Sequence, residues 1–349
     1  MKKRTACLIA LMSAMTMALT GCSVGNSVNN SAEAANVDGV SIPLGEVNFY
    51  LRYQQTQMST YSGYFGEDFM NQDLMGTGSI YGDTVKDTVV QTLEEYYLIE
   101  AHAGDIGISL SDGDKAAAVE AADAFLAAND SKTLKAMSAD KETVTHVLEL
   151  MTLQNKAYEN RAATIDTNVT DEEAAQKTIT YVRSSTSGTT DDDDNTVDLT
   201  DEELAEKKEV LDQIRDEAGA DGDLDAAAEI HGLSAVTTSY GADDENLNEN
   251  VKAAAETLSD GEYADIVEGD NAYLVRMDST FDREATDNHK QVILTQREKD
   301  AYTAWVDSLK ENADITTNDD ALAKLTFERV FTQKSADESE ADEAGETAQ

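Results

Sequence analysis

The chain has 349 residues, with 70 acidic against 26 basic side chains and a formal net charge of −44 at pH 7. This charge repels nucleic acid and anionic lipid and excludes a polybasic membrane patch, but it suits basic or unfolded partners. Of the two cysteines, Cys7 falls in an N-terminal leader, so the mature chain has no thiol pair to oxidise and depends on packing. Its length indicates two domains, or one long helical body with an insert.

The N-terminus has the pattern of a secretory leader. Three basic residues at 2–4 precede an apolar stretch over 6–19, which is too short for a stable membrane span. The sequence then reads Leu-Thr-Gly-Cys at 19–22, which resembles a bacterial lipobox. In proteins of that kind the cysteine is lipidated and becomes the first mature residue. Residues 1–21 are therefore expected to be a lipoprotein signal peptide, with Cys22 as the lipidation site.

The segment after the leader predicts a tether and then a folded region. Residues 22–35 are rich in Ser, Asn, Gly and Ala, which is typical of a flexible tether. A short hairpin turning at Asp38 and Gly39 is expected next, followed by a helix from about Leu44. Residues 59–82, rich in Gly, Tyr, Phe and Met, predict a long irregular loop with at most a short helix.

Three further helices are expected in the N-terminal half. Apolar residues at helical spacing predict one over 81–103, closed by glycines. Ser111 is expected to cap a helix that ends near residue 128, and Ser138 to cap one over 141–163.

Two capping-box patterns, Thr170 to Glu173 and Thr200 to Glu203, mark helix starts in the next region. The elements expected around them are a strand at 178–184, a helix from the second box to about 218, a helix at 224–231, a strand at 234–239, a helix at 251–258 and a hairpin of 264–268 with 272–278. A C-terminal helix over 283–312 and one short element within 313–332 should come next. The last residues, from 335, are acidic and lack aromatics, which indicates disorder.

Several short segments together carry a family pattern; they are 37–39, 44–50, 81–87, 103–111 and 258–268. With this order of elements they resemble the parvulin-type foldase lipoproteins of the PrsA and SurA kind. The resemblance implies an α+β fold in which a helical chaperone region (36–168) and a C-terminal helix (281–332) pack together. These flank a small parvulin-like domain (169–280) with a four-stranded antiparallel sheet and helices, and 333–349 remains a disordered acidic tail.

The resemblance also implies where an isomerase site would lie. Active members carry one histidine in the first strand of the parvulin domain and another in the last, linked by hydrogen bonds beneath the proline pocket. Tyr181 and Tyr273 align with those positions, and none of the four histidines does. Tyrosine hydroxyls donate and accept, so the pair could rebuild a catalytic hydrogen-bond network. Alternatively, both rings fill the core of a domain that has lost peptidyl-prolyl isomerase activity, which we favour; whether the chain is an enzyme stays open.

Residue types suited to binding unfolded clients are concentrated in the N-terminal region. Ten of the 21 aromatic residues lie within 49–97, together with methionines, a mixture that suits a surface accepting many partners. Tyr61, Tyr64, Phe65 and Phe69 lie in a segment without helical periodicity. We expect these four to line a client groove, the alternative being that they belong to the core.

No metal or cofactor is expected. Asp191 to Asp194, with Asn195 and Glu202, offer oxygen ligands, but Thr196 stands where an EF-hand loop needs glycine. A solvated acidic loop is the favoured interpretation. The spacing of His, Cys and acidic residues indicates no zinc site.

These features predict a foldase or chaperone anchored by lipid on the extracellular face of a bacterial cell membrane, of the Gram-positive type. Its partners would be unfolded or newly secreted polypeptides and the membrane, not nucleic acid, and a homodimer is left open. The alternative is a lipid-anchored lipoprotein that binds a solute or a cell-wall component without a folding role. Such proteins usually show repeated strand-helix units, whereas long helices dominate here.

Overall fold

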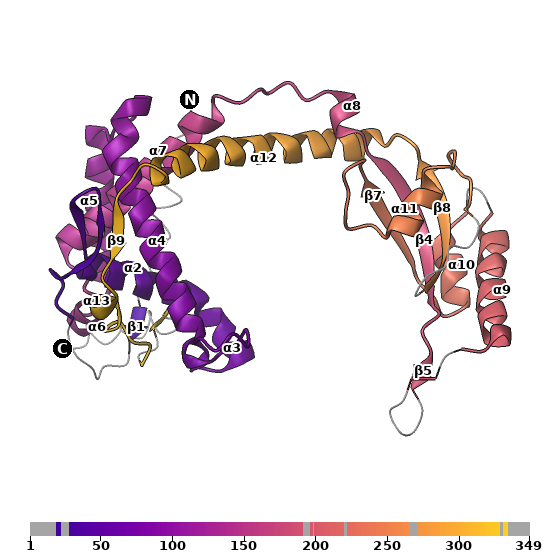
Figure 1. The fold of residues 1–349 in the computed structure, drawn as a ribbon, viewed down its shortest axis with the longest axis horizontal. Helices are drawn as coiled ribbons and strands as arrows, with labels where there is room; N and C mark the ends of the chain where they lie inside the picture. Colours follow the sequence, from indigo (N-terminus) through magenta and orange to yellow (C-terminus); the bar gives the residue numbers. More distant parts are fainter. Residues whose placement is uncertain are drawn as a thin grey trace, which may run out of the picture. The chain divides into compact units, whose positions relative to one another are not determined.

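The computed structural model describes residues 19–21, 28–190, 196–197, 199–219, 222–264, 271–328 and 331–333. The chain divides into two units (Figure 1): the first comprises residues 1–165 with 298–349, and the second residues 166–297. The second unit therefore includes the start of the C-terminal helix, which was expected to lie outside the parvulin-like domain. Among the described residues, no helix is both long and apolar enough to cross a membrane.

The first unit is mainly helical. Its longer helices pack around a core of aliphatic and aromatic side chains; they are α2 (Leu44–Gln57), α4 (Tyr81–His102), α5 (Asp112–Ala128) and α7 (Lys141–Ala162). Its short helices are η1 (Met58–Tyr61), α3 (Ser62–Phe65), η2 (Phe69–Asn71), η3 (Ala103–Ile106), α6 (Ser131–Ala136) and α13 (Asp319–Leu322).

A three-stranded antiparallel sheet joins the two ends of the chain within this unit. Strand β2 (Glu33–Val37) lies between β3 (Val40–Pro43) and β9 (Ile315–Thr317). The turn between β2 and β3 is the expected Asp38-Gly39 pair, and both residues have positive φ, of 51° and 86°. Strand β2 begins inside the segment predicted as a tether, because Ala34 and Ala35 are buried in the core. The folded part therefore begins before residue 36.

A second, two-stranded sheet pairs β1 (Leu19–Gly21) with β10 (Phe331–Gln333). Residues 22–27 and 334–349 lie outside the described residues, and with them Cys22 and nearly all of the predicted tail.

One predicted helix cap is wrong. Ser111 caps α5 in a capping box with Asp114, as expected, but the cap of α7 is Asp140, whose carboxylate accepts from the Thr143 amide at 2.8 Å. Ser138 instead has a φ of 59° and is buried. Its hydroxyl donates to Asn30 Oδ1 at 2.8 Å. The serine therefore holds a turn in place rather than starting the helix.

The second unit is built on an antiparallel sheet of order β7-β4-β8. Its strands are β4 (Lys177–Ser185), β7 (Ala235–Tyr240) and β8 (Asn271–Ser279), and its helices are α8 (Asp171–Ala174), α9 (Asp201–Ala218), α10 (Leu224–Ile230), α11 (Glu249–Ala255) and the first part of α12 (Arg283–Lys310). A short hairpin adds β5 (Thr189–Thr190) and β6 (Thr196–Val197).

The two faces of this sheet carry separate cores. Val182 and Leu274 pack against α9 and α10. Ile179 and Val275 face the opposite side, with Val251 of α11. Residues 265–270, where most of the fourth strand was expected, lie outside the described residues, although the Ala264 amide donates to the Val275 carbonyl at 2.8 Å. With helices and small antiparallel sheets in both units, the predicted α+β class is confirmed.

Candidate functional site

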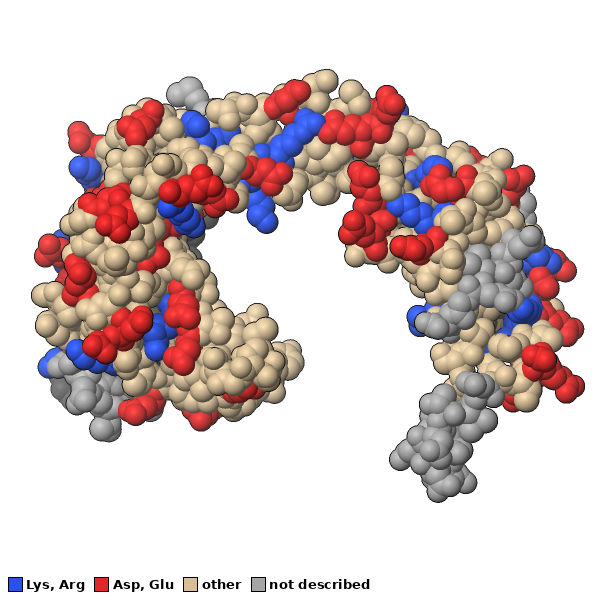
Figure 2. Space-filling view, in the orientation of Figure 1, with Lys and Arg blue, Asp and Glu red and all other residues tan. Residues whose placement is uncertain are grey.

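Three exposed aromatic side chains come after α2 in the first unit. Tyr61 ends η1, and Tyr64 and Phe65 belong to α3; these three residues are the aromatic surface. They are 50%, 85% and 51% exposed. The region around α3 presents mostly side chains that are neither acidic nor basic (Figure 2). Because this four-residue helix has no apolar face packed on the core, its aromatic rings remain available to solvent.

Phe69 does not belong to the aromatic surface. It is 4% exposed and packs in the core beside Met70, with its ring centroid 6.0 Å from that of Tyr81. The structure therefore separates the four residues that were predicted to line one groove: three are exposed and the fourth is a core residue.

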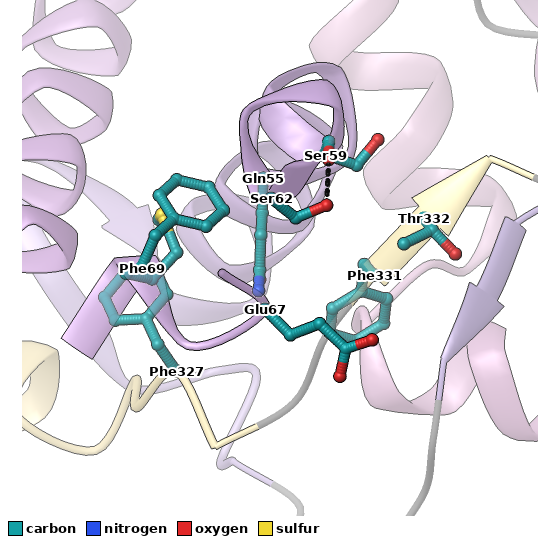
Figure 3. A pocket seen from close by; sticks show the side chains of 9 residues that line it. Gln55, Ser59, Ser62, Glu67, Phe69, Phe327, Phe331 and Thr332 are labelled. Carbon is teal, nitrogen blue, oxygen red and sulfur yellow. Dashed lines mark hydrogen bonds between the residues drawn. The ribbon is translucent and has the colours of Figure 1, made fainter. Parts of the chain in front are cut away.

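Phe69 also lines a pocket in the first unit (Figure 3). Its other lining residues come from two distant parts of the chain: Gln55, Ser59, Ser62, Glu67 and Met70, and then Phe327, Phe331 and Thr332. The space between the lining residues amounts to about 300 Å³ when the adjoining open solvent is counted. Phenylalanine rings and polar groups share its lining.

Arg52 holds the C-terminal wall of this pocket in place. Its Nη2 donates to the Thr326 carbonyl at 2.8 Å, across 274 residues of sequence. Its guanidinium lies 5.5 Å from the ring centroids of both Phe327 and Phe331. These are cation–π distances. Sequence reasoning missed these residues, because the only available signal was two phenylalanines four apart in a segment with no periodicity.

A partly buried charged cluster ties three helices of the same unit together. His146 Nδ1 of α7 lies 2.8 Å from Glu46 Oε1 of α2, and the Tyr97 hydroxyl of α4 donates to Glu46 Oε2 at 2.9 Å. Glu100 Oε1 lies 3.6 Å from His146 Nε2. Interactions with Glu100 and Glu46 raise the pKa of His146 to about 10. Burial, together with the charge of Glu46, raises the pKa of Tyr97 well above its usual range. His146 is therefore a cation that crosslinks helices.

Tyr181 and Tyr273 lie on neighbouring strands, β4 and β8, and on the same face of the sheet. Their ring centroids are 6.0 Å apart, with the planes inclined at 63°. Between these two described side chains the contact is ring against ring, with no hydroxyl-to-hydroxyl hydrogen bond. Tyr273 is buried and Tyr181 half-buried, within an apolar cluster that includes Tyr240 and Val251.

The histidines of the second unit lie away from this pair. His231 comes directly after α10 and contacts Glu217 at 3.2 Å. His289 lies on α12, with Nδ1 2.8 Å from Gln176 Nε2. Neither residue belongs to β4 or β8, so the sheet face that carries the tyrosines has no imidazole from the described strands.

Metal ligands are not gathered anywhere in the part of the chain that the structure describes. There, no cluster of three or more His, Cys, Asp or Glu side chains could hold a metal ion. The acidic run at 191–194 lies outside that part.

One family model matches the N-terminal part of the chain. Residues 1–165 match the family model of the SurA-like N-terminal domain. Over these residues the chain is similar to a SurA-like N-terminal domain, in agreement with the predicted resemblance to foldases of the PrsA and SurA kind. A search of curated proteins found no match.

Solved structures similar to the chain include foldases and chaperones of this kind. The foldase protein PrsA from Lactococcus lactis is 17% identical, with 84% of this chain and 97% of that chain covered and a TM-score of 0.33. The peptidylprolyl isomerase PrsA from Bacillus cereus is 15% identical over 72% and 96% of the two chains, with a TM-score of 0.32. A SurA-like chaperone from Campylobacter jejuni is 13% identical over 82% and 99%, with a TM-score of 0.30.

Proposed function

We propose that this protein is a chaperone for newly exported polypeptides, held by a lipid on Cys22 at the outer face of a bacterial cell membrane of the Gram-positive type. The observation that carries the proposal is the aromatic surface on a SurA-like domain. The rings of Tyr61, Tyr64 and Phe65 are rigid, exposed and largely apolar, so they lose little side-chain entropy on binding. Unfolded chains expose apolar segments, which can bind to these rings.

The charge of the molecule supports the same function. A net charge of −44 keeps a complex with an aggregation-prone client soluble and repels other copies of the chaperone. The region around α3 carries few of these charges (Figure 2), so the apolar contact is made where acidic groups do not have to be desolvated.

The second unit, in this proposal, binds or spaces clients without turning over prolyl bonds. Tyr181 and Tyr273 contact each other ring to ring inside an apolar cluster, which is the arrangement of core residues. A network that holds a twisted amide needs hydroxyl groups directed at one another or at the substrate. The pair therefore supports loss of isomerase activity.

The test is suppression of aggregation of a heat-denatured client, followed by light scattering. The mature chain should suppress aggregation, and the triple variant Tyr61→Ser, Tyr64→Ser, Phe65→Ser should lose most of that effect. Ile230→Ser with Val292→Ser is the matched control, because both residues are also exposed, at 74% and 60%, but belong to the second unit. If the triple variant suppresses aggregation as well as the control does, the aromatic surface is not the client site.

Anchoring is tested separately. Radiolabelled palmitate should enter the protein in cells and should fail to enter a Cys22→Ala variant. Recovery of the wild-type chain from the cytosol with residues 1–21 still attached would contradict the proposed location.

A further inference from the structure

Strand β10 is paired with the last three residues of the predicted signal peptide. The register is antiparallel, with Leu19 opposite Gln333, Thr20 opposite Thr332 and Gly21 opposite Phe331. In the described residues, β1 and β10 form a sheet of their own. Cleavage before Cys22 would remove every residue of β1 and none of β10.

We propose that removal of the leader opens this edge of β10 and that an extended segment of a client polypeptide then adds to it as a strand. In the precursor, Leu19–Gly21 occupy this edge. This inference rests on the proposed function, since it requires both export with cleavage and client binding.

The occupant is an extended peptide because the structure already holds one there. Three residues of the leader lie on β10 in antiparallel register, so the edge accepts a strand without rearrangement. Strand addition uses main-chain hydrogen bonds, which do not depend on side-chain identity and suit clients of unrelated sequence. A second copy of the chain is disfavoured because an edge of three residues buries far less area than a stable dimer needs.

The surroundings of β10 fit the same occupant. The strand packs against α2 and η1, and η1 ends at Tyr61 of the aromatic surface. Phe331 and Thr332 line the pocket that also contains Phe69 and Phe327 (Figure 3). Alternate side chains of an added strand point to opposite faces, so one set can reach this pocket while the backbone pairs with β10. The edge and the pocket thus supply the two parts of a strand-addition site.

The experiment locks the leader onto β10. A full chain carrying Cys7→Ser and Cys22→Ser, which prevents lipidation and cleavage, receives Thr20→Cys and Thr332→Cys. These positions are directly opposed in the register, at a separation that a disulfide spans. The comparison protein is the chain from residue 22 onward with Cys22→Ser and Thr332→Cys, so that both proteins carry the same residue at position 332 of the pocket. The client is a carboxymethylated, permanently unfolded protein without free thiols, and its binding is measured by fluorescence anisotropy.

We expect the oxidised, locked chain to bind the client about tenfold more weakly than the mature chain. The reason is that the client can no longer form two or three main-chain hydrogen bonds with β10 or the accompanying contact with the pocket. Hydrogen exchange provides the second measurement. The amides of residues 331–333 should exchange faster in the mature chain than in the locked chain, and slow again when client is added.

The outcomes separate the two proposals. Equal affinity of the locked and mature chains, or no protection of 331–333 by client, overturns the strand-addition site while leaving the chaperone function intact. A mature chain that does not bind the client at all overturns the proposed function and this inference with it.

Discussion

Glu46 Oε1 and His146 Nδ1 lie 2.8 Å apart and join helix α2 to helix α7 inside the first unit. The pKa of His146 is raised to about 10 by Glu100 and Glu46, against an ordinary value near 6.5. A group whose pKa is raised on folding stabilises the fold fully below its unfolded pKa and loses that contribution as the pH rises through the folded pKa. The contribution of this ion pair to the stability of the protein should therefore be lost as the pH becomes alkaline.

Unfolding free energy should fall between about pH 6.5 and pH 10 because of His146. The variant His146→Gln should remove this component of the slope and, at pH 6, should cost about 1–3 kcal/mol because Glu46 is left buried without its cation. Urea denaturation at a series of pH values measures both effects. His102→Gln, which alters an exposed histidine paired with Asp105, is the control and should keep the slope. An unchanged slope in the His146 variant would show that the pair is uncharged.

Phe69 and Tyr64 should respond in opposite ways to truncation, although they lie in one segment. Phe69→Ala should destabilise the protein by about 3–5 kcal/mol because it opens a cavity in the core. Tyr64→Ala should change stability by no more than about 0.5 kcal/mol because the ring is 85% exposed, yet it should weaken client binding. The denaturation midpoints of the two variants, together with client affinity, test the separation. Equal midpoints would contradict the burial of Phe69.

Proline-limited refolding should not be accelerated by the mature chain, because Tyr181 and Tyr273 pack on each other within an apolar cluster. The assay monitors refolding of a protein whose slow phase is cis–trans isomerisation, with an active prolyl isomerase as the positive control. Acceleration that disappears in both Tyr181→Phe and Tyr273→Phe would show instead that the hydroxyl groups catalyse the reaction.

Gly82 should not tolerate a side chain. A Cβ added there would lie 2.4 Å from Phe327 Cδ2 and 2.7 Å from the Met70 carbonyl oxygen. Gly82→Ala should therefore cost about 1–3 kcal/mol and displace the wall of the pocket that Phe327 forms. Gly104→Ala is the matched control, since nothing lies within 4 Å of its added Cβ, and it should be neutral or slightly stabilising. A difference in thermal midpoint between the two variants measures the effect, and equal midpoints would contradict the close approach.

Elements specified by local patterns were predictable from the sequence. The Thr200 to Glu203 box opens α9, which ends at Ala218 as expected. The alternating run around residue 180 forms β4. The same rule was less successful at Thr170, whose hydroxyl accepts from the Glu173 amide but caps a helix of only four residues. Local hydrogen bonding can start a helix, whereas the length of that helix is limited by the next element of the chain, here the strand from Lys177.

Features that depend on distant parts of the chain were not predictable. Phe69 is buried because Phe327 and Phe331 come back to the same region, and no spacing within 59–82 signals their arrival. Serine is a residue type that often caps helices, but the side chain of Ser138 forms hydrogen bonds to Asn30 and Asn48, which lie far away in sequence. The exposure of Tyr61, Tyr64 and Phe65 agrees with the lack of helical periodicity in their segment, but the same pattern did not distinguish them from Phe69.

Strand β2 lies between β3, which comes directly after it in the chain, and β9, which comes near the end. Synthesis proceeds from the amino end, so the sheet of the first unit is incomplete until residues 315–317 have been made. The second unit is one continuous segment, residues 166–297, so its folding does not depend on residues made later. The first unit, which is started first during synthesis, is therefore completed last. The second unit can fold as a domain before the C-terminal residues of the first unit have been made.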